Sequence, residues 1–222
     1  PSNYYYQSRL VNGPGMAIET SRPWHAVGAL GPYRFFDVPG QEEKRSMSNG
    51  TFTKSTLNST EAQMVVQLVA FLCQQFPDYS FKQKIGIITP YSEQKKKIQR
   101  ELMRQFGNDS QQLKRLIEVS TVDGFQGQES EIIIFSCVRT GQNRGVGFLS
   151  DARRMNVALT RAKSSLFVLG RAESLRRHGL WRALIDDAKT RGVLVPYDEE
   201  VWNEMRRACS PFAGRIPSNL SK

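Results

Sequence analysis

The sequence predicts an α/β fold in which helices cover both faces of a mostly parallel central sheet, giving three layers. The strand-like apolar runs lack the polar alternation of a half-exposed sheet, so both faces of the sheet should be buried. Segments with helical spacing of apolar residues alternate with these runs along the chain. This alternation is typical of strand–helix–strand units in a parallel sheet.

The first third of the chain begins irregularly. Residues 1–32 are expected to be a lead-in without regular structure, because Gly and Pro interrupt them repeatedly. Residues 33–38 are a predicted strand, and residues 39–57 are predicted to be a flexible polar loop. A helix is expected after Asn58, which can cap its first turn, and Pro77 should follow its end.

The second part of the chain repeats the alternation. Strands are predicted over residues 84–89, 117–121, 131–138 and 164–169, and helices over residues 92–106, 151–160 and 180–190. The carboxyl ends of parallel strands meet at one edge of a sheet, where ligands of such sheets bind. Residues 89–91, 121–124 and 170–171 should therefore lie together at that edge.

The C-terminal part is expected to be a tail. From about Val195 onward the sequence has three prolines and mixed charges, which predicts partial disorder. The expected organisation is therefore a lead-in at residues 1–32, one α/β domain at residues 33–196 and a tail at residues 197–222.

The charge of the chain is unevenly distributed. Its formal net charge is +10, and residues 1–80 hold six basic and six acidic side chains, so the whole excess lies in residues 81–222. A polyanionic partner such as nucleic acid is a natural inference. The basic clusters could equally be solvated helix faces.

Composition argues against two other kinds of site. Three cysteines lie far apart, and two histidines form no ligand spacing with them, so no metal site is expected. No apolar run approaches the roughly 18 residues that a membrane span needs, so no membrane partner is expected.

Residues 121–129 can form a contact loop for a ligand. Gly124 and Gly127 allow close backbone approach, two glutamines supply amide groups, and Glu129 can accept hydrogen bonds from a pair of ribose hydroxyls. An ordinary hydrophilic turn between strands explains the same residues equally well.

Arg161 is the sharpest candidate. If residues 151–160 form a packed helix, Met155 and Leu159 face inward and Arg161 is held at the helix exit. Its guanidinium is always charged and planar, which suits the charge that builds on a γ-phosphate during transfer. A surface cation favoured by the helix dipole is the alternative.

Two motifs of nucleotide hydrolases are missing. The sequence has no Gly-x-x-x-x-Gly-Lys-Ser/Thr phosphate loop, and no apolar run ends in paired acidic residues suited to magnesium. The chain by itself is not expected to hydrolyse a nucleotide well.

Three segments in register resemble a known family. Residues 87–94, 120–129 and 156–163 resemble motifs IV, V and VI of the C-terminal RecA-like motor domain of superfamily-one helicases of the Upf/senataxin type. Ser92 departs from the pattern, because relatives often carry Arg or Lys there. Segments around this core are similar to the senataxin branch with its fungal Sen-type transcription-termination helicases, namely residues 10–16, 22–25, 33–37, 147–149 and 151–155.

The resemblance implies a RecA-like three-layer αβα fold and an ATP-dependent helicase that moves 5′ to 3′ on single-stranded RNA or DNA. By the family pattern, Arg161 is the arginine finger, Glu129 contacts the nucleotide sugar and Gly127 shapes that loop. The residues implied to lie on the nucleic-acid side, or to couple it to the nucleotide site, are Thr89, Pro90, Tyr91, Thr121, Asp123 and Gly124.

The resemblance also implies partners. ATP with Mg²⁺ would be held mainly by a preceding RecA-like domain, whose Tyr-Arg-Met-His-Pro motif stands before this segment in the family. Nascent RNA or RNA–DNA hybrids in transcription termination, transcription or RNA-processing proteins, and a nuclear location are implied, with a cytoplasmic location as the alternative. A non-catalytic nucleic-acid or protein-binding module remains the competing interpretation, and a stand-alone nucleoside-phosphate enzyme is a weaker one.

Overall fold

The computed structural model describes residues 13–40, 43–44, 56–107, 109–140 and 147–221. Its centre is a six-stranded sheet in the order β5-β4-β6-β7-β1-β8, in which every neighbouring pair is parallel. The strands are β1 (Tyr33–Asp37), β4 (Ile85–Thr89), β5 (Ile117–Thr121), β6 (Ser130–Ser136), β7 (Ala162–Gly170) and β8 (Leu194–Val195). Each of the strands predicted from the sequence is confirmed within two residues at either end.

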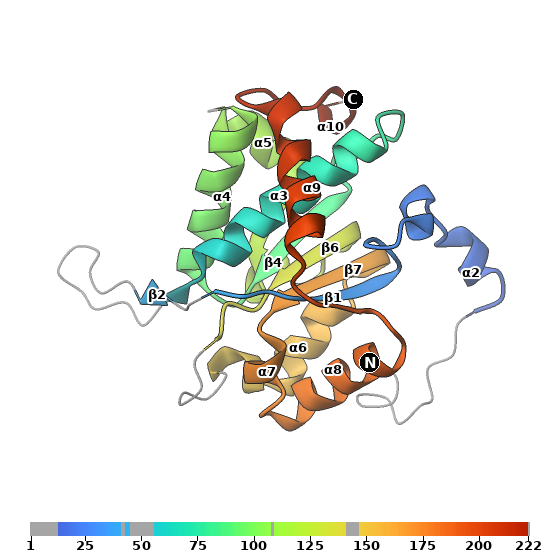
Figure 1. Ribbon diagram of the computed structural model, residues 1–222, viewed down its shortest axis with the longest axis vertical. Helices are drawn as coiled ribbons and strands as arrows, with labels where there is room; N and C mark the ends of the chain where they lie inside the picture. The colour runs from blue at the N-terminus through green and yellow to red at the C-terminus, as the bar shows by residue number, and fades with distance from the viewer. Residues whose placement is uncertain (1–12, 41–42, 45–55, 108, 141–146, 222) are drawn as a thin grey trace.

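Helices cover both faces of this sheet (Figure 1). One layer holds α3 (Ser59–Gln75), α4 (Ser92–Phe106), α5 (Ser110–Leu116) and α9 (Glu199–Cys209). The other holds α6 (Ala152–Leu159), α7 (Ala172–Leu175) and α8 (Gly179–Thr190). The short elements are α2 (Met16–Glu19), η1 (Pro23–Ala26), η2 (Asp123–Phe125), η3 (Gly147–Ser150), η4 (Ser210–Phe212) and α10 (Ser218–Ser221).

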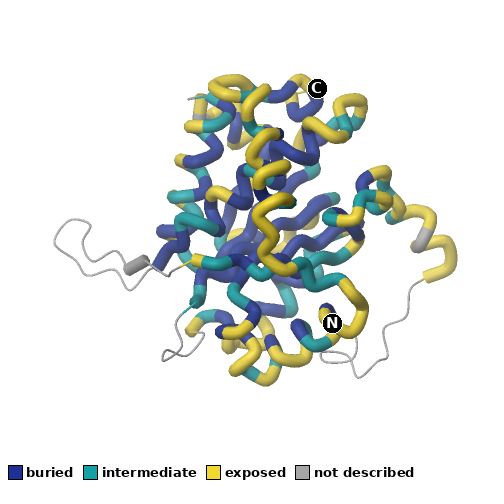
Figure 2. Tube along the Cα trace, in the orientation of Figure 1, coloured by how far each residue is buried: buried dark blue, intermediate teal, exposed yellow. Residues whose placement is uncertain are grey.

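Two apolar cores separate the three layers. Ile85 and Ile87 of β4 face the core under α3 and α4, whereas Ile88 of the same strand faces the core under α6 and α8. Both sets are buried because successive side chains of a strand point to opposite faces. Figure 2 shows the buried strands between helices whose outer sides are exposed. The predicted three-layer, RecA-like α/β fold is thus confirmed.

The predicted cap of the first long helix is confirmed. The Asn58 side chain accepts a hydrogen bond from the Glu61 N–H at 3.1 Å, which satisfies a donor that the first turn of α3 leaves open. The apolar stripe that follows is buried against the sheet and α9. Helix α5 was not expected from the sequence.

The expectation of a partly disordered C-terminal tail is wrong for residues 199–209. They form α9, which begins at the capping residue Asp198 and packs on α3 through Trp202, Met205 and Ala208. Their spacing of three residues lays one apolar face along the helix. Asn219 then donates hydrogen bonds to the carbonyls of Cys73 and Phe76 at 3.0 and 2.9 Å, so the last turn is also fixed to α3.

The lead-in is likewise more ordered than its composition suggests. Trp24 and Leu30 are fully buried in the core under α3. In the expected loop 39–57, the described residues form a short antiparallel pair, β2 (Glu43–Lys44) with β3 (Thr56–Leu57). Residues 41–42 and 45–55 of that loop lie outside the described part.

Candidate functional site

The carboxyl edge of the sheet brings together the predicted motif residues of β4 and β5. Thr89 and Thr121 are register partners at the ends of these strands, and the Val122 N–H donates to the Thr89 carbonyl at 3.2 Å. The Thr89 side chain and Pro90 are buried, whereas Tyr91 and Thr121 are partly exposed. The backbone of Thr89 therefore ties the two strand ends together, and Tyr91 and Thr121 present the accessible groups.

Asp123 and Gly124 complete this edge and are exposed. The Gly124 N–H donates to the Thr121 hydroxyl at 3.2 Å. A Cβ at Gly124 would lie 2.6 Å from the Ser120 hydroxyl oxygen, so a larger residue would require the Ser120 side chain to move.

The amino edge of the sheet carries the other predicted residues. The Ser130 N–H donates to the Arg161 carbonyl at 3.1 Å, so the residue after Glu129 is bonded directly to Arg161. Gly127 and Glu129 are exposed, and Gly127 has a φ of +81°, which favours glycine because side chains clash there. The expectation that the unusual residues gather at one edge holds for 89–91, 121–124 and 170–171, while Gly127, Glu129 and Arg161 lie at the opposite edge.

Arg161 leaves α6 as predicted. Met155, Ala158 and Leu159 are buried beneath the helix, and the Asp151 carboxylate caps its start by accepting from the N–H groups of residues 153 and 154. The Arg161 guanidinium is half-buried, and it donates from Nε to the Val157 carbonyl and from Nη2 to the Thr160 hydroxyl, both at 3.0 Å. Within the described residues no carboxylate pairs with this guanidinium. It is a positioned cation at a helix C-terminus.

Two connectors run between the two edges over the same face of the sheet. Residues 122–129 cross β4 with only the short 3-10 helix η2, and the buried Phe125 ring fixes this crossover. A Cβ at Gly86 would lie 2.8 Å from that ring, so the Phe125 ring can pack there because Gly86 has no side chain. The second connector is α6, about 12 Å long at 1.5 Å per residue over its eight residues.

The start of α6 touches the carboxyl edge. The Arg154 Nε lies 3.3 Å from an Asp123 carboxylate oxygen, and its guanidinium lies 3.9 Å from the centre of the Phe148 ring. Since Arg161 stands at the other end of the same helix, one rigid element joins both edges. The sequence analysis did not select Arg154, and its position in the first turn of the helix that ends at Arg161 could have indicated it.

Arg139 is a second functional candidate that the sequence reasoning missed. It follows β6, and its guanidinium carbon lies 6.0 Å from the centre of the Tyr91 ring. A cation beside an aromatic ring at the carboxyl edge suits both a phosphate and a base. Only its location after a buried strand could have suggested it.

A buried polar network supports this edge from within. The Glu61 carboxylate accepts hydrogen bonds from the Ser136 hydroxyl at 2.6 Å and from the Val138 N–H at 2.9 and 3.1 Å. Gln94 joins it by donating to the Asn58 carbonyl and to the Ser136 hydroxyl. Burial raises the pKa of Glu61 to about 7, although these hydrogen bonds act in the opposite direction. Val138, which has a φ of +73°, is held in this strained conformation.

A groove continues from the carboxyl edge along the outer strand β5. It has a volume of about 820 Å³ and lies between α4, α5 and β5. Lys95, Lys96 and Lys114 line it together with apolar side chains of the two helices. The charged side chains of this groove are therefore mainly basic, with Glu118 as the one carboxylate among the described residues that line it.

Two kinds of feature are absent from the described ranges. No group of three or more His, Cys, Asp or Glu side chains there could hold a metal ion. No helix in these ranges is long and apolar enough to cross a membrane.

A parallel α/β domain with an exposed Gly/Gln turn bonded to a positioned arginine has the features of one half of a nucleotide-driven motor. The profile of the family described as AAA domain matches residues 1–173, so the chain belongs to this family. It is a superfamily-one helicase domain of the Upf/Sen type, as the resemblance predicted.

Three relatives illustrate this relationship. Helicase SEN1 of Saccharomyces cerevisiae is 48% identical over 88% of this chain, and Helicase sen1 of Schizosaccharomyces pombe is 44% identical over 86%. Probable helicase senataxin of Homo sapiens is 38% identical over 88% of the chain. The chain spans only 8%, 11% and 7% of the lengths of these three relatives.

Proposed function

We propose that this chain is the second RecA-like domain of an ATP-dependent helicase that moves 5′ to 3′ on single-stranded RNA or DNA. The observation that carries the proposal is the 3.1 Å hydrogen bond that joins Ser130, directly after Glu129, to Arg161. It brings a carboxylate suited to a ribose and a cation suited to a phosphate to one edge of the sheet.

ATP fits this edge as the proposed substrate, with Mg²⁺ held mainly by a preceding RecA-like domain. Glu129 is exposed and can accept hydrogen bonds from ribose hydroxyls, while Arg161 stands at a packed helix end. A fixed guanidinium can stabilise the charge on a transferring phosphoryl group. Arg161 would act as the arginine finger, and Gly127 gives the loop the conformation that exposes Glu129.

The carboxyl edge is the proposed track for the strand. Tyr91, Thr121, Asp123 and Gly124 are accessible there, and the buried Thr89 and Pro90 position them. The surrounding cations would bind the phosphates of the strand backbone. The affinity should therefore depend little on the base sequence and should fall as the salt concentration rises. Helix α6 and the 122–129 crossover link this track to the nucleotide edge, so opening and closing of the nucleotide cleft can shift the track.

We also propose the cellular setting from the relationship to Helicase SEN1. The full protein would act on nascent RNA or RNA–DNA hybrids in transcription termination, in the nucleus, with transcription or RNA-processing proteins as partners. A cytoplasmic location is the alternative.

Replacement of the finger tests the motor function. In a protein that joins this domain to its preceding RecA-like domain, Arg161→Ala should lower strand-stimulated ATP turnover by about 10³-fold or more and leave strand binding mostly intact. The exposed Arg207 on α9 offers a matched control, and Arg207→Ala should leave turnover unchanged. Near-normal turnover in Arg161→Ala would refute the finger assignment.

A non-catalytic binding module is the competing function, which the net charge of +10 also suits. It predicts strand binding without any nucleotide-linked behaviour. The unaltered two-domain protein distinguishes the two functions. ATPase activity stimulated by single strands supports the motor, and its absence supports the binding module.

A further inference from the structure

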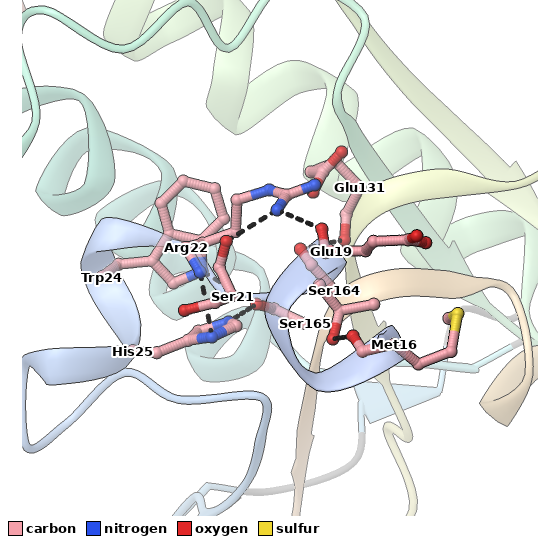
Figure 3. Close-up of polar contacts among 10 residues, drawn as sticks. Met16, Glu19, Ser21, Arg22, Trp24, His25, Glu131, Ser164 and Ser165 are labelled. Atoms are coloured by element: carbon pink, nitrogen blue, oxygen red, sulfur yellow. Dashed lines mark hydrogen bonds and ion pairs between the residues drawn. The ribbon is translucent and has the colours of Figure 1, made fainter. Parts of the chain in front are cut away.

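The lead-in is fastened to the amino edge of the sheet by a cluster of polar contacts, drawn in Figure 3. The Trp24 Nε1 donates to the Ser165 hydroxyl at 2.8 Å, and His25 Nε2 lies 2.9 Å from the same oxygen. Arg22 forms an ion pair with Glu131. The lead-in thus contacts β6 through Glu131 and β7 through Ser165.

These contacts are buried and specific. Trp24 and Ser165 are fully buried, and the Arg22 and Glu131 side chains are 23% and 14% exposed. The Arg22 N–H donates to His25 Nδ1 at 3.2 Å, so the proton of a neutral ring lies on Nε2 and points at Ser165. Burial lowers the pKa of His25, with Arg22 and Arg34 adding to the effect, so the neutral ring is favoured.

The fastened strands are those that present Glu129 and Arg161. Glu131 lies two residues after Glu129, and Ser165 lies four residues after Arg161. The Ser164 hydroxyl donates to the Glu131 carbonyl at 2.9 Å. Along the chain, only Ser130 separates Glu129 from Glu131, and only residues 162–164 separate Arg161 from Ser165.

The ladder between these strand starts is irregular. Ser130 pairs with Ala162, but Ile132 pairs with Ser165, so Glu131 alone faces two residues of β7. A bulge of this kind changes the direction of nearby side chains and leaves the ladder locally disrupted. The distance between Glu129 and Arg161 therefore depends on contacts from outside the ladder, and Arg22 supplies one at Glu131.

We propose that Arg22 and Glu131 are positioning residues for nucleotide turnover, whose ion pair holds the β6–β7 bulge in the shape that aligns Glu129 with Arg161. This proposal rests on the proposed function. It assigns a role to the Arg-Pro-Trp-His segment, which lies outside the three helicase motifs. The chain that enters the domain is thereby tied to the nucleotide edge, because Trp24 and His25 anchor the same segment on Ser165.

A charge swap in the joined two-domain protein tests this role. Arg22→Glu and Glu131→Arg should each raise KM for ATP, and the Kd of a fluorescent non-hydrolysable ATP analogue, by about tenfold, because sub-ångström misplacement of binding groups is costly. The double variant should return both values to within about threefold of the unaltered protein. Glu131→Gln serves as the milder variant if either reversal fails to fold.

The Arg176–Asp186 ion pair, at 2.6 Å on the far side of the domain, provides a matched control. Arg176→Glu should leave both nucleotide constants unchanged. Because this pair is 49% and 43% exposed, its loss should lower Tm less than loss of the Arg22–Glu131 pair. Unchanged constants in the folded Arg22 and Glu131 variants, or losses that the double variant does not restore, would overturn the positioning role. Failure of the proposed function shows separately, as near-normal turnover in Arg161→Ala.

Discussion

At the carboxyl edge of the sheet, buried residues support the exposed motif residues. At the amino edge, the loop that carries Gly127 and Glu129 is itself exposed. Thr89 and Pro90 are buried, and the Glu61 network lies beneath the end of β6. Gly127 and Glu129, in contrast, are exposed, and among the described residues Arg161 forms hydrogen bonds with Val157 and Thr160 of its own helix turn and with Ser130.

This difference suggests how the two edges work. A preformed edge can hold a strand without rearranging, and this suits a track that must bind in every stage of a cycle. An edge with exposed groups and an irregular ladder is suited to completion by a second domain, because its groups are accessible and the ladder alone does not set their spacing. We infer that the nucleotide edge depends on partners and that the strand edge is largely self-supporting.

The largest effect expected at the self-supporting edge concerns Glu61. Its pKa in the folded protein, about 7, lies above the ordinary value of 4.5, so its contribution to stability is fully present below about pH 4.5 and is lost as the pH rises through 7. The full loss amounts to roughly 3 kcal/mol, from about 1.4 kcal/mol per pKa unit. Burying the charged carboxylate is the physical cause.

Glu61→Gln should remove this titration. Between pH 5 and pH 8 the free energy of unfolding of the variant should rise relative to the unaltered protein by roughly 3 kcal/mol, as measured by urea denaturation. Glu204→Gln, at an exposed position on α9, is the matched control and should show no such trend. A constant difference between Glu61→Gln and the unaltered protein would contradict a buried titrating carboxylate.

Tyr91 should give the next largest effect, on strand binding alone. Loss of a ring that stacks on a base costs roughly 1–3 kcal/mol, so Tyr91→Ala should weaken binding of a single-stranded oligonucleotide by about tenfold or more. Nucleotide affinity should stay unchanged because the ring lies at the carboxyl edge. Fluorescence anisotropy with labelled RNA and DNA strands measures the first quantity, and equal losses for nucleotide and strand would break the division between the edges.

Arg154 should show the smallest effect. Its pair with Asp123 is exposed, and such pairs contribute little to stability, so Arg154→Ala should leave Tm nearly unchanged. Removal of one phosphate-binding cation should weaken strand binding by a few-fold and reduce the slope of log affinity against log salt by about one. An unchanged slope would show that Arg154 does not contact the bound strand. Its role would then be limited to holding α6 in place.

The sequence predicted the parts of the molecule that depend on local pattern. The buried strands, the Asn58 cap and the helix that ends before Arg161 all follow from apolar spacing and capping residues. Helix α9 was missed because the prolines on either side of it and its own charged residues outweighed the spacing of Trp202, Met205 and Ala208. The order and spacing of three motifs predicted the family, and the matches to residues 1–173 and to the Sen-type relatives confirm it.

The tertiary structure alone decided which residues meet. Gly124 and Gly127 are three residues apart in one loop, yet that loop crosses the sheet from one edge to the other, so the residues around them serve different edges. Arg22 and Glu131 are far apart in sequence and form one ion pair, which no local pattern could indicate. Sequence determines helices, strands and their caps through short-range sterics and hydrogen bonds, whereas the pairing of distant strands and side chains follows only from the packing of the whole chain.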